Sequence, residues 1–425
     1  MFLFAGTFLA LLLLGIPIAI ALGMSAVIYL LATGNLQMLL IFPQRMINSI
    51  DQFVLLSVPL FLLVGNLMNL GGITDQVLRF SKAMVGHIRG GLSLVTIVAS
   101  MFFGGVTGAA AADTAALGSV LIPAMAKEGY RKDYAAALLT VCAVVGAVIP
   151  PSITMVVYGA LAQVSVAQLF IAGIVPGVLI GVALIPYAWW VAKRHGYPVT
   201  IRVNMRERLR ATVGAAPILV LPALILGGIM FGVFTPTESA AVAVLYILLL
   251  AGAYRAMSWR TVWRPIADAA LMTAAIMFIV AMASMIQFIF SYERIPAQIT
   301  RLMLGITGDR DLLLLLIIVL LLVLGMFLET IAAMILALPV LIEVANVIQI
   351  DPVHFGTVVV IALAIGLATP PVGICLFIAC AISKEPIEKV SLTMLPMIGI
   401  AIGVLLLVAY VPQIALFLPS LVFER

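Results

Sequence analysis

Two isolated carboxylates stand out in a very apolar sequence. Asp113 is the only formal charge in residues 90–126, and Glu329 is the lone charge of its own apolar segment; each is followed directly by a threonine. A carboxylate inside a membrane helix costs about 2.5–3.5 kcal/mol on insertion scales, so each acid needs a partner. Cations are the obvious partners.

Two proline pairs interrupt apolar stretches. Pro150-Pro151 ends one such segment, and Pro370-Pro371 lies inside residues 358–382, a run long enough to cross a bilayer. Adjacent prolines remove two amide donors and clash with the preceding turn, so a continuous helix is broken at each pair. Inside hydrocarbon, a break survives only where it is buried in protein or lines a polar cavity. Two broken helices in corresponding halves predict the central site of a transporter.

Oxygen atoms near these breaks suit a hard cation such as Na⁺. Hydroxyl groups and freed carbonyls supply them, while the near absence of His argues against a transition metal. New helix N-termini would receive a substrate carboxylate without an intramembrane Arg. The predicted ion-binding residues are Ser100, Gly104, Gly105, Thr107, Gly108, Asp113, Thr114, Pro150, Ser152, Glu329, Thr330, Gly366, Thr369, Pro370, Val372 and Gly373. The predicted substrate-binding residues are Gly105, Thr107, Pro151, Ser152, Pro371 and Val372.

The same order of features occurs twice. An acid-Thr pair, a proline ten residues after the acid and a Pro-Pro pair follow one another in each half. The Pro-Pro pairs are offset by 220 residues and the acids by 216, so this alignment predicts a duplication of about 220 residues with a gap of four. We expect two repeats of inverted topology, because their breaks can then meet near the membrane midplane.

Composition places the chain in a membrane. Of its 425 residues, 65% are hydrophobic and 9% are charged, too little polar surface to cover a soluble globule. Its long apolar runs favour helices over a β-barrel, because a helix needs about 20 apolar residues to span a bilayer and a barrel strand needs about half as many. The three cysteines, in apolar segments, are interpreted as packing residues. The first basic residue is Arg45, so we expect no cleaved signal peptide.

Several segments have simple structural interpretations. Residues 2–33 form one kinked helix or two short ones, residues 36–50 an interfacial amphipathic helix, and residues 74–91 and 292–311 polar connections. Residues 392–421 form a last apolar run. The stretch from Gly104 to Gly108 predicts a turn before a helix, as in a re-entrant hairpin, although Gly and Ala are also ordinary packing residues. Glu238 is a candidate helix N-terminal acid, with Thr237 as a capping candidate.

A cluster of six cations lies between positions 193 and 210, opposed only by Glu207; they are Lys193, Arg194, Arg202, Arg206, Arg208 and Arg210. Such clusters mark cytoplasmic loops. A specific contact with anionic lipid is the alternative interpretation. A nucleic-acid partner is not expected, because the excess of positive charge is local.

Motifs along essentially the whole chain resemble one transporter family. The stretch from Gly108 to Pro123, Ile149-Pro-Pro-Ser152, Thr235-Pro-Thr-Glu-Ser239 and Thr369-Pro-Pro-Val-Gly373 are similar to the large (DctM-like) membrane subunit of tripartite ATP-independent periplasmic (TRAP) transporters. The resemblance implies Na⁺-coupled uptake of an organic acid delivered by a periplasmic binding protein, with a small four-helix membrane subunit as a separate partner chain. It also implies an elevator-type fold in the bacterial inner membrane, with a scaffold and a mobile transport domain.

The expected protein is therefore an all-α polytopic membrane transporter with broken helices and re-entrant hairpins, not an enzyme, and without a cofactor other than Na⁺ as coupling ion. Its expected parts are an N-terminal region with an interfacial arm (1–52), a first repeat (53–192), a basic cytoplasmic loop (193–214), connecting helices (215–258) and a second repeat (259–425). A stand-alone divalent-anion/Na⁺ symporter of related architecture is one alternative. An intramembrane aspartyl protease is the enzyme alternative, but Asp113 follows four alanines and its counterpart is Glu329.

Overall fold

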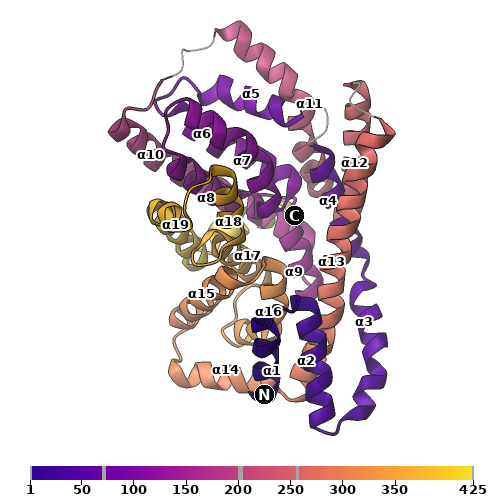
Figure 1. The fold of residues 1–425 in the computed structure, drawn as a ribbon. Coiled ribbons are helices and arrows are strands. Elements are labelled where there is room, and N and C mark those ends of the chain that lie inside the picture. Colours follow the sequence, from indigo (N-terminus) through magenta and orange to yellow (C-terminus); the bar gives the residue numbers. More distant parts are fainter. Residues whose placement is uncertain (1, 69–72, 200–203, 255–257, 424–425) are drawn as a thin grey trace.

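A computed structural model describes residues 2–68, 73–199, 204–254 and 258–423, and Figure 1 shows it as a ribbon of helices. Across these ranges, seven helices are long and apolar enough to cross a membrane, or up to nine if each bent helix pair is one span. The expected all-α polytopic fold is confirmed.

The N-terminal part begins with two helices and not one kinked helix. Gly15, at a φ of +77°, and Pro17 separate them. The segment that was expected to be interfacial is a 3-10 turn followed by a short helix without buried residues, and it bends by 60° into the next helix. These elements are α1 (Phe2–Leu13), α2 (Ile18–Ala32), η1 (Leu36–Ile41), α3 (Phe42–Ile50), η2 (Phe53–Leu56) and α4 (Ser57–Met68).

Six helices of the first half match six of the second. The first set is α5 (Ile73–Val85), α6 (Gly91–Thr107), α7 (Ala110–Lys127), α8 (Lys132–Val148), α9 (Ile153–Ala162) and α10 (Val166–His195). The second set is α14 (Ile295–Ile306), α15 (Arg310–Phe327), α16 (Thr330–Val347), α17 (Pro352–Ala368), α18 (Ile374–Ser383) and α19 (Ile387–Tyr410). The stretches 74–91 and 292–311 are thus not mere polar connections, because each contains an amphipathic helix.

The remaining helices connect the sets or close the chain. Between them lie α11 (Met205–Met230), α12 (Pro236–Ala253) and α13 (Trp259–Tyr292). The last apolar run divides at Val411 into α19 and α20 (Gln413–Phe423). Thr235, and not Thr237, caps α12: its hydroxyl accepts from the Glu238 amide, while Glu238 Oε2 accepts from the Thr235 amide at 2.8 Å. The Thr237 hydroxyl instead donates to the Phe53 carbonyl, joining α12 to η2.

The two sets are intertwined and inverted. After each Pro-Pro break the chain crosses to the other set, so α9 packs on α16 and α18 packs on α7. In the same way α10 packs on α17 and α19 on α8. Figure 1 places α5 and α14 at opposite ends of the molecule, so the two sets enter from opposite sides.

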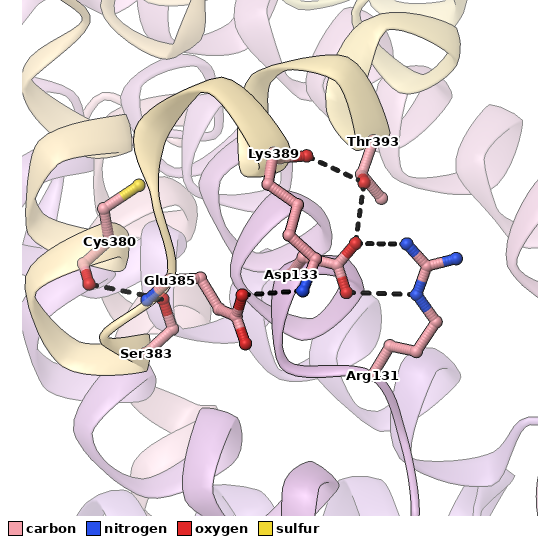
Figure 2. Close-up of polar contacts among 7 residues, drawn as sticks. All are labelled: Arg131, Asp133, Cys380, Ser383, Glu385, Lys389 and Thr393. Atoms are coloured by element: carbon pink, nitrogen blue, oxygen red, sulfur yellow. Dashed lines mark hydrogen bonds and ion pairs between the residues drawn. The ribbon is translucent and has the colours of Figure 1, made fainter.

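A cluster of polar side chains connects the two sets at one face of the molecule (Figure 2). Buried Asp133, in the first turn of α8, accepts hydrogen bonds from Arg131 and from the Thr393 hydroxyl of α19, the latter at 2.9 Å. Hydrogen bonding to Asp133 raises the pKa of the Arg131 guanidinium. Lys389 of α19 pairs with Glu385 at 2.8 Å beside them. This cluster therefore ties the start of α8 to the start of α19.

Basic side chains collect on this same face. The Arg131 amide donates to Tyr197, which follows α10; Lys82 of α5 pairs with Glu128 after α7 at 3.5 Å; and Arg208 of α11 contacts His87. The face thus includes the ends of α5, α7, α10 and α11. The positive-inside rule predicts that this is the cytoplasmic face.

Candidate functional site

The first hairpin turns at Gly108 and not at Gly104-Gly105. Helix α6 runs through both of those glycines to Thr107, and Gly108 then adopts a left-handed φ of +64°. A Cβ on Gly104 would overlap with the backbone of Gly146 in α8, so this glycine serves close helix packing. A Cβ on Gly108 would overlap with the Pro151 carbonyl, which is why the turn needs glycine there.

Matched glycines hold the second hairpin in the same way. A Cβ on Gly366 of α17 would overlap with Gly325 of α15. Gly325 lies near the end of α15 as Gly104 does in α6, and Gly366 lies near the end of α17 as Gly146 does in α8. Without side chains at these crossings, each hairpin lies directly against the broken helix of its own set.

The backbone after each break bonds to the hairpin turn of its own set. The Ile153 amide donates to the Gly108 carbonyl at 3.3 Å, and the Gly373 amide donates to the Met326 carbonyl at 3.1 Å. Ser152 caps α9, since its hydroxyl accepts from the Met155 amide and donates to the Ala147 carbonyl at 2.6 Å. Thr369 instead ends α17, where its hydroxyl donates to the Ile365 carbonyl at 2.7 Å. The two breaks are therefore similar but not identical.

The acids occupy different positions in the two hairpins. Glu329 is the N-cap of α16 and accepts from the Ile331 and Ala332 amides at 2.9 and 3.3 Å. The N-cap of α7 is Ala109, and Asp113 lies further along, inside the helix. The offset between the starts of α7 and α16 equals the offset between the two Pro-Pro pairs, and so does the offset between the starts of α8 and α17. The gap of four residues that the acids predicted is therefore wrong.

A cavity of about 310 Å³ lies where the hairpin turns and the breaks meet. First-turn or N-cap residues of α7, α9, α16 and α18 line it, and α4 and α13 form the opposite wall. The lining residues at the hairpin turns and helix starts include Thr107, Ala110, Ile153, Glu329, Thr330 and Ile374. The prediction that both breaks contribute to one central site is consistent with this arrangement, because Ile153 and Ile374 each follow a break directly.

Helix N-termini are the source of positive potential in this cavity. Glu329 is the only charged side chain among the described residues that line it, and no Arg, Lys or His occurs there. The N-caps of α7 and α18 are Ala109 and Gly373, neither of which caps its helix with a side chain. Their first-turn amides thus remain available, and a helix N-terminus carries roughly half a positive charge. At α16, in contrast, Glu329 already satisfies the first amides.

Buried side-chain oxygens without partners occur in both sets, and one of them belongs to Thr330, which lines the cavity. The Thr107 hydroxyl donates to Asp113 Oδ1, but Asp113 Oδ2 has no hydrogen-bond partner, although Asp113 is 1% exposed. The buried hydroxyls of Ser100 and Thr330 also lack partners. Buried polar groups normally have partners, and such oxygens are the ligands that Na⁺ uses. Carboxylate and hydroxyl oxygens of this kind have the chemistry that a bound Na⁺ would need.

Some of the predicted site residues line the cavity and the others do not. Thr107, Gly108, Glu329 and Thr330 line the cavity. Outside its lining lie Ser100, Gly104, Gly105, Asp113, Thr114, Pro150, Pro151, Ser152, Gly366, Thr369, Pro370, Pro371, Val372 and Gly373. Of the six residues expected to bind substrate, only Thr107 lines it. The wall from α4 and α13 includes Asn66, Met272 and Ile276, and its sequence signal was limited to Asn66, a polar residue in a mostly apolar helix.

The two breaks also differ in exposure. Pro150, Pro151 and Ser152 are buried, whereas Thr369 and Pro370 are half-buried and Pro371 is exposed. The first break is therefore enclosed by its neighbours, and the second is open on one side.

A family model and related sequences all identify this chain with the same group of transporters. Residues 5–414 match the family model described as the tripartite ATP-independent periplasmic transporter, DctM component. The chain is 39% identical to the isethionate TRAP transporter permease protein DctMQ of Oleidesulfovibrio alaskensis, over 97% of this chain and 65% of that one, so it spans about two thirds of this relative's length. It is 37% identical to the sialic acid TRAP transporter large permease protein SiaM of Vibrio cholerae, over 97% of each chain.

Two further comparisons concern a dicarboxylate permease and a solved structure. The C4-dicarboxylate TRAP transporter large permease protein DctM of Rhodobacter capsulatus is 33% identical over 98% of each chain. The YdaH transporter of Alcanivorax borkumensis, described as having an unusual topology, has a similar fold: the TM-score is 0.62 at 15% identity, over 90% of this chain and 89% of that one.

Proposed function

This chain belongs to the family of DctM components of tripartite ATP-independent periplasmic transporters, and from that premise we propose that it imports an organic acid by Na⁺-coupled transport. It is a transporter subunit of the bacterial inner membrane and not an enzyme, so the aspartyl protease alternative is set aside. The names of its relatives include isethionate, sialic acid and C4-dicarboxylate, all of which are acids or their anions.

One observation carries the proposal. Four helix N-termini converge on the cavity between the hairpins, and two of them, those of α7 and α18, have no side-chain cap. An anionic substrate group is favoured there by backbone amides and helix dipoles. The amides of α7 and α18 are the proposed receptors, because their N-cap residues leave them unsatisfied.

The proposed coupling ions lie behind the substrate. Asp113 Oδ2 and the Ser100 hydroxyl supply unpartnered side-chain oxygens in the first set, and the Thr330 hydroxyl supplies one in the second. Carbonyls next to Pro370 are further proposed ligands, because proline has no amide to donate to them. Cations close to the cavity would also lower the cost of placing a carboxylate near Glu329. Binding of the ion and binding of the substrate would therefore be coupled.

The proposed motion is of elevator type. The hairpins and broken helices, α6 to α9 and α15 to α18, form the mobile part, and α4 and α11 to α13 form the scaffold. The cavity lies between these two groups of helices, so sliding of one against the other would move its contents relative to the membrane. A periplasmic binding protein that delivers the substrate and a small four-helix membrane subunit on a separate chain complete the proposed assembly.

Uptake by proteoliposomes tests this function. The chain is reconstituted with its small membrane subunit, and a labelled panel of carboxylates and sulfonates is offered with and without the cognate binding protein, under an inward Na⁺ or K⁺ gradient. We expect uptake of an acid that requires both Na⁺ and the binding protein. Uptake that needs Na⁺ but no binding protein would favour the stand-alone symporter, and equal uptake in K⁺ would exclude sodium coupling.

A further inference from the structure

A second cavity, of about 420 Å³, lies between α5 and α11. Its lining residues are Gln76, Arg79, Glu207, Arg210, Ala211 and Gly214. None of them lines the transport cavity, and both helices belong to the basic face. This site is therefore separate from the proposed substrate pathway.

The charges in this cavity favour an anion. Arg79 comes from α5 and Arg210 from α11, and no carboxylate of the described residues forms an ion pair with either guanidinium. Glu207 is the single acid of the lining, so the two arginines leave a net positive charge. Arg208, on another side of α11, is already engaged with His87 at 3.1 Å. Two guanidinium groups from two helices can bind one phosphate with several charge-assisted hydrogen bonds.

An apolar stripe runs along the same end of α11. Met205, Leu209 and Val213 are spaced four residues apart and are 73%, 64% and 64% exposed. Helix α11 then continues through the membrane to Met230. Its first turns therefore lie at the cytoplasmic boundary of the bilayer, where a polar headgroup and an acyl chain meet. This stripe lies about 150° around α11 from the side chains that line the cavity, so it marks the lipid-facing side of the helix and is not part of the headgroup site.

We propose that this cavity binds the headgroup of an anionic phospholipid. Its phosphate is held by Arg79 and Arg210, at the end of α11 where this helix enters the bilayer. Because α5 also packs on α6, the first helix of the re-entrant hairpin, the lipid would brace the junction between α11 and that hairpin. This inference does not depend on the identity of the transported acid.

Native mass spectrometry of the detergent-purified membrane complex tests the proposal. Short-chain phosphatidylglycerol is titrated, with phosphatidylcholine and inorganic phosphate as separate arms. We expect retained phosphatidylglycerol on the complex, and the Arg79→Gln/Arg210→Gln variant should weaken its retention by about 25-fold, since each basic residue near an anionic lipid contributes about fivefold. The matched control, Arg89→Gln/Arg206→Gln, removes the same charge from the same face outside the cavity and should change retention little.

Two variants that keep both arginines distinguish a loss of lipid binding from a folding defect. Glu207→Gln removes the only acid of the lining and should tighten retention, a gain that damage to the fold would not produce. Gly214→Leu fills the cavity and should weaken retention; a Cβ at Gly214 meets nothing within 4 Å, so the helix accommodates it. Equal losses in the cavity and control pairs would overturn the proposal, as would equal retention of inorganic phosphate, a preference for phosphatidylcholine, or weaker retention in Glu207→Gln.

Discussion

Gly146 of α8 and Asp113 of α7 fit together because glycine has no side chain: a Cβ on Gly146 would overlap with Asp113 Oδ2. The same glycine faces Gly104 of α6, so three helices meet at one point. The acid at the first hairpin is therefore positioned by the broken helix of its own set, and the hairpin and the break act as one unit.

Gly146→Ala should therefore displace Asp113. We expect a loss of Na⁺-driven uptake and a fall in stability of about 1–3 kcal/mol from overpacking, measured by proteoliposome transport and thermal unfolding. Adding Asp113→Ala should restore much of the stability but not the uptake. Gly399→Ala is the matched control, since a Cβ there meets nothing within 4 Å. Wild-type uptake by Gly146→Ala would show that Asp113 needs no fixed position.

Asp113→Asn should raise the Na⁺ concentration for half-maximal uptake by about 10- to 100-fold, the usual effect of removing a group that orients metal ligands. The reason is that Asp113 Oδ2 is buried and unpartnered while Oδ1 orients Thr107. Glu329→Gln should have a smaller effect on the Na⁺ curve, because Glu329 already accepts two backbone amides of α16. If both variants kept the wild-type Na⁺ dependence, each acid would be reassigned to a structural role.

Thr369→Ala should weaken the apparent Na⁺ affinity by about tenfold, the equivalent of one lost charge-assisted contact of about 1.5 kcal/mol. The dependence on binding-protein concentration should not change, because the break lies deep in the membrane. Thr357→Ala is a matched control on the same helix: both hydroxyls donate to the carbonyl four residues earlier, at 2.7 Å for Thr369 and 2.9 Å for Thr357. Both curves are measured in the same proteoliposomes. An unchanged Na⁺ curve with a shifted binding-protein curve would assign the break to docking or hinge motion.

Thr393→Val should destabilise the protein by about 1.5–3 kcal/mol, because a hydrogen bond to the buried charge of Asp133 is lost. Thr393→Ser keeps the hydroxyl and should remain close to wild type. A double-mutant cycle with Asp133→Asn, read by thermal unfolding of the purified protein, should show coupling between the two residues. Additive effects would mean that the polar cluster in Figure 2 does not join the two repeats energetically.

Local covalent chemistry made much of the fold predictable from the sequence. Pro150-Pro151 and Pro370-Pro371 lack amide donors, so the helices had to break there, and the lone acids in apolar segments indicated a site that needs partners. The apolar composition determined an all-α membrane protein, because every backbone group in lipid must be satisfied internally. The repeated order of these features indicated two related halves.

Other features depended on which surfaces meet. Membrane helices are apolar toward lipid and toward protein alike, so periodicity does not show which face packs inside. For this reason the sequence did not reveal that α4 and α13 wall the cavity, or that Gly104 packs on Gly146 and does not form a turn. Asp113 and Glu329 looked equivalent in sequence, but only the tertiary structure placed one against Gly146 and the other at a helix cap. Local chemistry determined where the chain breaks, and long-range packing decided what each break faces.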